Sequence, residues 1–339
     1  MNASPRRAPA PPGAPRPTIL DGGMGQELVR RSARPPTPLW SSDVLLHEPA
    51  LVAALHADYI DAGADVITLA SYTATPERLA RDGAADRFEA LQRAAADCAL
   101  EARRASGPRI ADDVGAGRRP PVRIAACLPP LVGSYRPDTM PDEAVALGSW
   151  RRIVALQADA CDLVLCETMG SIAEAVTAAR AGLESGLPVW VGLTVDDDRS
   201  GRLRSGEGVA EAVRALEALG VGAGRLEAIL LNCSTPEAID AAWPGLAGAR
   251  ATTGAYANAF TSVAALEPGG TVAALERRED LGPEPYAARA RAWLAAGAGI
   301  LGGCCETTPA HVRALAALPG GAQGPHPPGA CQCPVPLAP

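Results

Sequence analysis

The feature that most constrains the fold is a repeated alternation, from Pro17 onward, of short apolar runs with longer stretches of helical character. This alternation is typical of βα units that build a parallel sheet. Because eight parallel strands close a barrel, the sequence predicts an α/β fold, a single-domain (β/α)8 TIM barrel. The predicted strands span roughly residues 17–20, 65–70, 122–127, 162–166, 188–194, 227–231, 251–256 and 299–302.

The predicted barrel domain covers residues 17–318, with a disordered tail on either side. Residues 1–16 are rich in proline and contain no apolar run of the signal-peptide kind. Residues 319–339 are too rich in glycine and proline to bury apolar surface, so we leave Cys331 and Cys333 out of the site. The glycines of 220–224 precede a strand instead of following one, and this order argues against a dinucleotide loop.

The amino-acid composition limits the kinds of molecule that the protein is expected to bind. The formal net charge of -7 argues against nucleic acid or an anionic membrane, because both favour clustered positive charge. The chain contains no lysine, which excludes Schiff-base chemistry and a Walker phosphate loop. No apolar segment approaches the ~20 residues that cross a bilayer, and nine cysteines are an odd number, which indicates a reducing compartment. We therefore expect a cytoplasmic enzyme for small-molecule substrates, as a monomer or small homo-oligomer.

Polar and sulfur-bearing residues collect at the carboxyl ends of the predicted strands, where the active site of such a barrel lies. The four histidines all lie elsewhere, so His-ligated metal sites lack their ligands. The strand-end residues are 21–25, 71–73, 127–129, 166–168, 194, 232–234, 256–258 and 303–305.

Two adjacent cysteines, Cys304 and Cys305, follow Gly302 and Gly303 at the eighth strand end. Neighbouring side chains of a strand point to opposite faces, so both sulfurs can reach one point only where glycines let the backbone leave the pleat. Cys233 ends the sixth strand, two strands away. Three thiolates at one point would hold zinc with a fourth position open, as in catalytic sites. The alternative is that Cys233 is a small buried hydrophobe and the doublet is accidental.

Two carboxylates also reach the predicted mouth of the barrel, Asp21 and Glu167. Either can serve as a general acid or base or pair with a substrate ammonium group. Asp21 can equally be a turn residue ahead of Gly22. Glu167 ends a buried apolar run, and a charge in that place favours a functional role.

The chain resembles the homocysteine S-methyltransferases, which include the betaine, S-methylmethionine and cobalamin-dependent methionine synthase types. The resemblance covers about residues 18–318. It implies zinc on Cys233, Cys304 and Cys305, and a homocysteine ammonium group held by Asp21 and Glu167. It also implies substrate contacts from Gly22, Trp40, Tyr72 and Asn258. The motifs that carry it lie at 21–25, 38–41, 70–76, 166–168, 232–233 and 302–309.

The resemblance implies zinc-dependent methyl transfer from a sulfonium donor to the thiol of homocysteine, giving methionine. S-methylmethionine is the expected donor, with S-adenosylmethionine as a poorer substitute. Betaine or another donor on the same scaffold is an alternative, because residues 127–135 depart from the family's Gly-Pro-Tyr-Gly-like loop. A second alternative is a non-catalytic zinc or redox protein that uses the adjacent cysteines.

Overall fold

The computed structural model describes residues 16–35, 37, 39–219, 225–263, 266 and 275–319. The two predicted tails, apart from Arg16 and Pro319, lie outside the described residues, as do Cys331 and Cys333. The same holds for the glycine-rich segment 220–224.

Eight parallel strands form the centre of the protein. Their order in the sheet is β1-β8-β7-β6-β5-β4-β3-β2, and a parallel bridge between Leu20 and Val66 closes the ring between β1 and β2. The predicted (β/α)8 barrel is therefore confirmed, and each predicted strand overlaps an observed one. The strands are β1 (Thr18–Ile19), β2 (Val66–Thr68), β3 (Arg123–Leu128), β4 (Leu163–Met169), β5 (Val189–Leu193), β6 (Leu226–Asn232), β7 (Thr252–Tyr256) and β8 (Ile300–Leu301).

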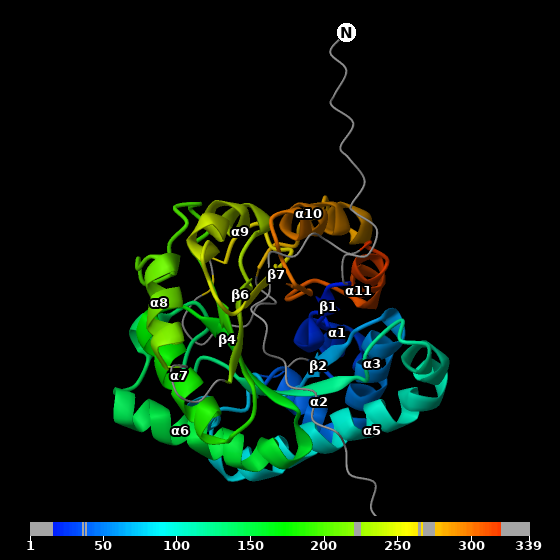
Figure 1. Cartoon of the computed structure of the whole chain (residues 1–339). Coiled ribbons are helices and arrows are strands. Elements are labelled where there is room, and N and C mark those ends of the chain that lie inside the picture. The colour runs from blue at the N-terminus through cyan, green and yellow to red at the C-terminus, as the bar shows by residue number, and fades with distance from the viewer. Residues whose placement is uncertain are drawn as a thin grey trace, which may run out of the picture.

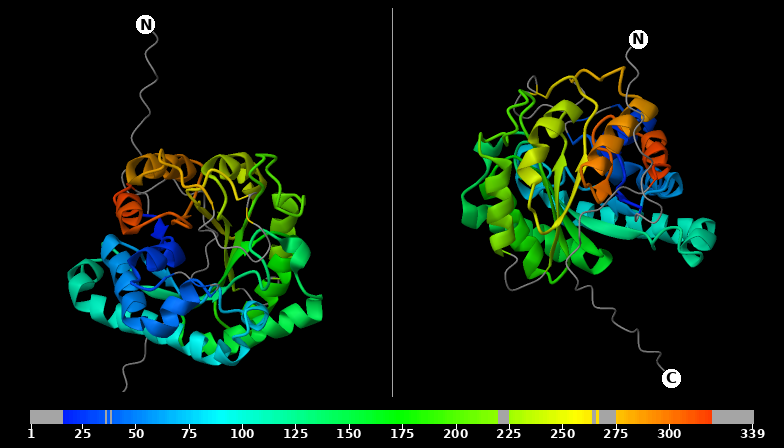
Figure 2. Two further views of the ribbon diagram at one scale, coloured as in Figure 1. Left: turned by 180° about the vertical axis from the view of Figure 1, so that it is seen from behind. Right: turned by 45° about the horizontal axis from the view of Figure 1, so that its top comes forward.

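Helices surround the strands as a ring, which Figure 1 shows nearly end-on and Figure 2 from two further sides. The ring consists of α3 (Pro49–Ala62), α5 (Phe88–Gly115), α6 (Glu143–Gln157), α7 (Ile172–Glu184), α8 (Val209–Leu219), α9 (Pro236–Ala242), α10 (Pro283–Ala295) and α11 (Pro309–Ala316). The shorter helices α1 (Met24–Arg31), α2 (Ser41–His47) and α4 (Pro76–Arg81) follow β1 and β2. None of the helices in the described ranges is both long and apolar enough to cross a bilayer.

Each strand is buried on two faces, which explains why the strand sequences are nearly continuous apolar runs. One cluster of buried side chains fills the space between the sheet and the helix ring. A second fills the barrel interior with, among others, Leu163, Leu165, Trp190 and Leu230. The interior is a packed core, so the space for a ligand is left to the barrel mouth.

Several motif residues at the mouth begin helices. The side chain of Thr75 accepts a hydrogen bond from the N–H of Arg78, and that of Thr235 accepts one from the N–H of Ala238. Thr308 forms a capping box with His311 at the start of α11. A proline follows each of these threonines, at a helix position where its missing N–H costs nothing. Such sharp helix starts keep the loops after β2, β6 and β8 short and fixed.

Candidate active site

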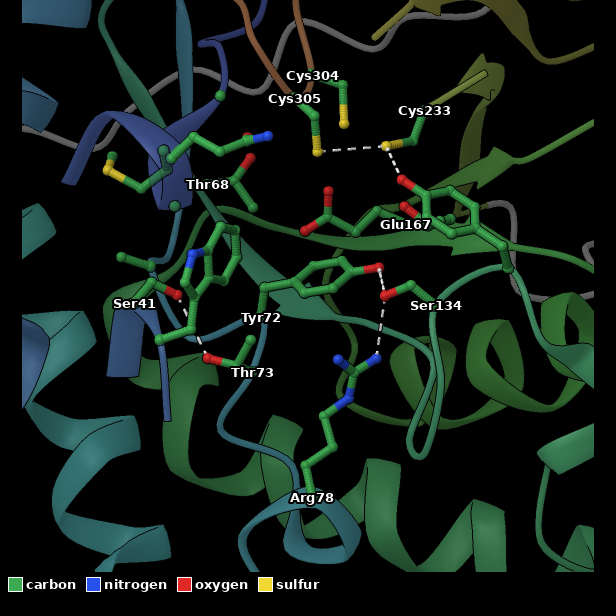
Figure 3. A pocket seen from close by; sticks show the side chains of 18 of the residues that line it. Ser41, Thr68, Tyr72, Thr73, Arg78, Ser134, Glu167, Cys233, Cys304 and Cys305 are labelled. Carbon is green, nitrogen blue, oxygen red and sulfur yellow. Dashed lines mark hydrogen bonds between the residues drawn. The ribbon is translucent and has the colours of Figure 1, made fainter. Parts of the chain in front are cut away.

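A cavity of about 160 Å³ opens at the carboxyl ends of the strands (Figure 3). Most of the residues predicted for the site line it; these are Asp21, Gly22, Trp40, Tyr72, Glu167, Cys233, Cys304 and Cys305. Asn258 does not line the cavity. Its side chain is buried, and its Oδ1 accepts a hydrogen bond from the N–H of Phe260, which makes it a support for the loop after β7.

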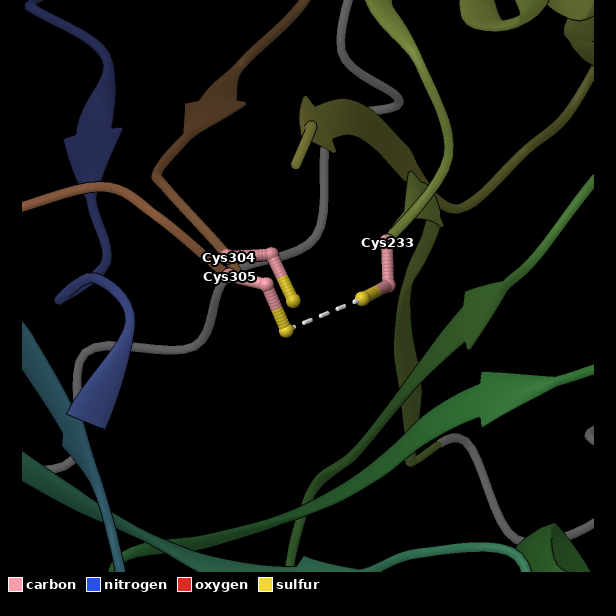
Figure 4. Close-up of side chains that lie close together, drawn as sticks. All are labelled: Cys233, Cys304 and Cys305. Atoms are coloured by element: carbon pink, nitrogen blue, oxygen red, sulfur yellow. Dashed lines mark hydrogen bonds between the residues drawn. The ribbon is translucent and has the colours of Figure 1, made fainter. Parts of the chain in front are cut away.

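The three predicted metal ligands converge (Figure 4). The Sγ atoms of Cys233, Cys304 and Cys305 all lie within 4.8 Å of one another, and those of Cys233 and Cys305 are 3.7 Å apart. Tetrahedral zinc with bonds of about 2.3 Å places its sulfur ligands about 3.8 Å apart. The spacing of the thiols therefore fits a thiolate-bound zinc ion.

Close backbone approach explains the two glycines before the cysteine pair. A Cβ on Gly302 would lie 2.5 Å from the Cβ of Leu20, and one on Gly303 would lie 2.1 Å from Oγ1 of Thr307. The Thr307 hydroxyl in turn donates to the carbonyl of Cys304, at 2.6 Å. Any larger residue at 303 would therefore displace the turn that aims both sulfurs.

Tyr135, which the sequence suggested only as a possible aromatic partner of Trp40, is a neighbour of the thiol cluster. Its hydroxyl lies 3.0 Å from Sγ of Cys233. Hydrogen bonds from the thiols of Cys304 and Cys305, and then from Tyr135, hold the pKa of Cys233 well below its usual value. Cys233 is thus the thiol in the cluster that most readily becomes a thiolate.

Asp21 is buried at the mouth rather than exposed in a surface turn. Its Oδ2 accepts a hydrogen bond of 2.7 Å from the N–H of Thr68. Burial raises the pKa of Asp21 to about 8, and the negative charge of Glu167 contributes to the increase. A carboxylate in this setting gains its charged form when a cationic group enters the cavity.

Glu167 lies within β4, where the pairing with β5 shifts between Cys166 and Met169. The next residue, Thr168, has a left-handed backbone (φ 63°) and is held by hydrogen bonds to the Asn232 side chain. Such an irregularity redirects a side chain of a strand. The thiol of Cys127 donates to Oε1 of Glu167 at 3.0 Å, yet burial still raises the pKa of Glu167 to about 7. This contact of Cys127 was not predicted.

Trp40 and Tyr72 form an aromatic part of the lining. Trp40 has a left-handed backbone (φ 50°), and its ring packs so closely on Gly25 that a Cβ there would lie 2.4 Å from the indole. The indole N–H has no partner among the described residues. The hydroxyl of Tyr72 hydrogen-bonds that of Ser134 at 2.9 Å. The aromatic faces therefore lie in the same cavity as the thiols.

Comparison with known proteins gives one consistent family. The family model described as homocysteine S-methyltransferase matches residues 18–318. Homocysteine S-methyltransferase 4 of Zea mays is 30% identical over 311 residues, which cover 88% of each chain. Selenocysteine Se-methyltransferase of Brassica oleracea var. italica is 30% identical over 321 residues, covering 88% of this chain and 87% of the relative. The crystal structure of the homocysteine methyltransferase MmuM from Escherichia coli in its metallated form superposes with a TM-score of 0.72 at 30% identity, covering 89% of this chain and 96% of that one.

Proposed function

Since this chain belongs to the homocysteine S-methyltransferase family, we propose that it moves a methyl group from a sulfonium donor to the thiol of homocysteine and releases methionine. The chain is thus an enzyme, and the alternative of a non-catalytic redox protein is wrong. The observation that carries the proposal is the convergence of Cys233, Cys304 and Cys305 in a cavity that also holds two carboxylates and an aromatic face. We assign this activity to a catalytic domain of residues 17–318.

The proposed metal is zinc, held by Cys233, Cys304 and Cys305. The 3.7 Å spacing between two of the sulfurs supports this assignment, as does the metallated form of the Escherichia coli relative. Bound zinc would lower the pKa of the homocysteine thiol, so that a nucleophilic thiolate is present at neutral pH. Tyr135, through its contact with Cys233, would fix the position of that ligand.

Asp21 and Glu167 are proposed to bind the ammonium group of homocysteine. Both face the cavity, and burial raises the pKa of each carboxyl group. Burial deprives these carboxylates of the water that would stabilise their charge. A bound ammonium group supplies that stabilisation and favours their ionised forms. The acceptor would then be held at its amino end by two charges and at its thiol end beside the cysteines.

Trp40 is proposed to hold the sulfonium donor against its ring. A cation over an indole face is stabilised by about 0.5 to 2 kcal/mol. The acceptor thiolate attacks the methyl carbon in line, as the bond from that carbon to the sulfonium sulfur breaks and a neutral thioether leaves. Opposite charges are dispersed in this step, so a cavity with little water favours it more than bulk solvent does.

Purified protein loaded with zinc tests the proposal when S-methylmethionine, S-adenosylmethionine and betaine compete for homocysteine. We expect the highest kcat/KM with S-methylmethionine, and methionine as the product. A higher kcat/KM with betaine than with S-methylmethionine would overturn the assignment of the donor. If protein with one bound zinc per chain transferred no methyl group from any of the three donors, the proposed reaction would be wrong.

A further inference from the structure

An arginine without a carboxylate partner lies in the wall of the same cavity. Arg78 of α4 is half-buried, and no carboxylate in the described part of the chain forms a salt bridge with it. Its Nη2 donates to the carbonyl of Pro130 at 3.0 Å and to Oγ of Ser134 at 3.3 Å, while its Nε has no hydrogen-bond partner among the residues that the structure describes. By contrast, the guanidinium of Arg81 on the same helix pairs with Asp82.

The surroundings of Arg78 suit an anion. Its guanidinium lies over the ring of Tyr72, 5.3 Å from the centroid, so one face is shielded from solvent. Burial lowers the pKa of Arg78 from its usual value, although the group stays charged. The charge of Arg78 acts on the carboxyl group of Glu174, but the two form no salt bridge in the described part of the chain. A desolvated cation without a salt-bridge partner is costly, and a carboxylate matches the planar fork of guanidinium donors.

A continuous line of contacts connects this arginine to the thiols. Ser134, which receives the Arg78 hydrogen bond, immediately precedes Tyr135, whose hydroxyl contacts Cys233. Figure 3 shows Arg78 on one side of the Tyr72 ring and the three cysteines on the other, with Ser134 at the hydroxyl end of the ring. Because Arg78 and the three cysteines line the same cavity, a molecule with its reactive group beside the thiols and its far end at the guanidinium would span that cavity.

We propose that Arg78, with Ser134 and Tyr72, binds the carboxylate of the methyl donor and so selects donors of the amino-acid or carboxylic-acid type over simple sulfonium ions. The inference rests on the proposed function and adds to it a residue that determines donor specificity. The acceptor also has a carboxylate, but that group shares a carbon atom with the ammonium group assigned to Asp21 and Glu167. We therefore place the acceptor carboxylate beside those two residues and assign Arg78 to the donor.

The test uses two near-isosteric sulfonium ions, 3-(dimethylsulfonio)propionate and the corresponding amide, in which a neutral carboxamide group replaces the carboxylate. Calorimetric titration without homocysteine measures their Kd values in the absence of turnover. We expect the wild-type protein to bind the carboxylate compound at least tenfold more tightly than the amide. Arg78→Met should reduce that ratio to about one, and Arg78→Lys should restore part of it. Arg93→Met, at an exposed position of α5 that does not line the cavity, is the matched control and should leave the ratio unchanged.

An unchanged ratio in Arg78→Met, or no preference in the wild-type protein, would overturn the inference. So would a variant that loses affinity for homocysteine while keeping the donor ratio, because the arginine would then bind the acceptor. If Arg78→Met unfolds, as judged by its melting temperature, the Arg78→Lys ratio decides: a ratio below that of the wild type supports the assignment, and an equal ratio rejects it. Tight carboxylate-dependent binding without any methyl transfer would refute the proposed reaction and leave the anion site in place.

Discussion

Glu167→Gln is the most informative change at the acceptor end of the cavity, because it keeps the shape of the side chain and removes its charge. A hydrogen bond to a charged group contributes about 1.5 to 3 kcal/mol, and a tenfold change in affinity corresponds to about 1.4 kcal/mol. We therefore expect the variant to bind an α-ammonium ligand about 10- to 150-fold more weakly when Glu167 is ionised in the wild type.

The size of this loss should depend on pH, because the pKa of Glu167 in the ligand-free cavity is about 7. The carboxyl group of Glu167 is then ionised in about 97% of the wild-type protein at pH 8.5 and in about 9% at pH 6. Wild-type affinity should rise by about tenfold over this range from Glu167 alone. Glu167→Gln has no carboxyl group to ionise at this position, so its affinity does not rise in this way. A 100-fold difference in affinity between the two proteins at pH 8.5 should therefore shrink to about tenfold at pH 6.

Asp21 has a pKa of about 8, so its ionisation causes a second rise in ligand affinity with pH, in the wild type and in the variant alike. Because the charge of Glu167 contributes to raising that pKa, its removal should lower the pKa of Asp21. The pH dependence that remains in Glu167→Gln should therefore occur at lower pH than in the wild type. This displacement is the signature of two carboxylates that share one site.

Calorimetric titration with methionine measures the effect, because methionine has the same ammonium group and no thiol to titrate. Glu174→Gln is the matched control. The pKa of Glu174 is also raised to about 7 by burial, but its Oε2 accepts the N–H of Gly170 and the residue does not line the cavity. An equal loss of affinity at pH 6 and pH 8.5, or the same loss in the control, would refute the assignment of Glu167.

Three further outcomes follow from the site. Cys233→Ala should abolish stoichiometric zinc binding and methyl transfer with the far-UV spectrum of the barrel retained, and full zinc content by atomic absorption would contradict the three-thiolate site. Trp40→Ala should raise KM for the donor by about 2- to 30-fold, the range of a cation–π contact, while KM for homocysteine stays constant. Asp21→Asn should raise the melting temperature of the ligand-free protein at pH 8.5 and change it little at pH 4, since a carboxyl pKa raised from 3.8 to about 8 means that stability falls as pH rises from the lower value to the higher one and then levels off; an equal effect at both pH values would reject the pKa shift.

The barrel and the thiol cluster were predictable for the same reason. Strands that are buried on two faces must be apolar along their whole length, so their ends stand out in the sequence. A closed parallel barrel then brings all carboxyl ends to one mouth. Cys233, Cys304 and Cys305 could be placed together because topology alone determines their proximity.

The contacts around this cluster were not predictable, because they depend on loops that reach across the barrel. Arg78 meets Pro130 and Ser134, which lie 52 and 56 residues further along the chain. The partner of Glu167, Cys127, comes from the neighbouring strand; the sequence places it at a strand end, but nothing in the sequence pairs it with Glu167. No local pattern links such pairs; a polar residue soon after a strand end was the only available signal.

Backbone conformation explains why the mouth in particular resists prediction. Left-handed φ values occur in the described ranges at six non-glycine residues, and four of them line the cavity: Trp40, Tyr135, Thr168 and Cys233. Each such conformation costs of order 1 to 3 kcal/mol and persists only where the surroundings enforce it. For Cys233 the enforcing contact is its N–H bond to the carbonyl of Tyr256, and for Thr168 it is the Asn232 side chain. The sequence therefore indicates which residues reach the site, whereas the direction of each side chain is set by the folded barrel.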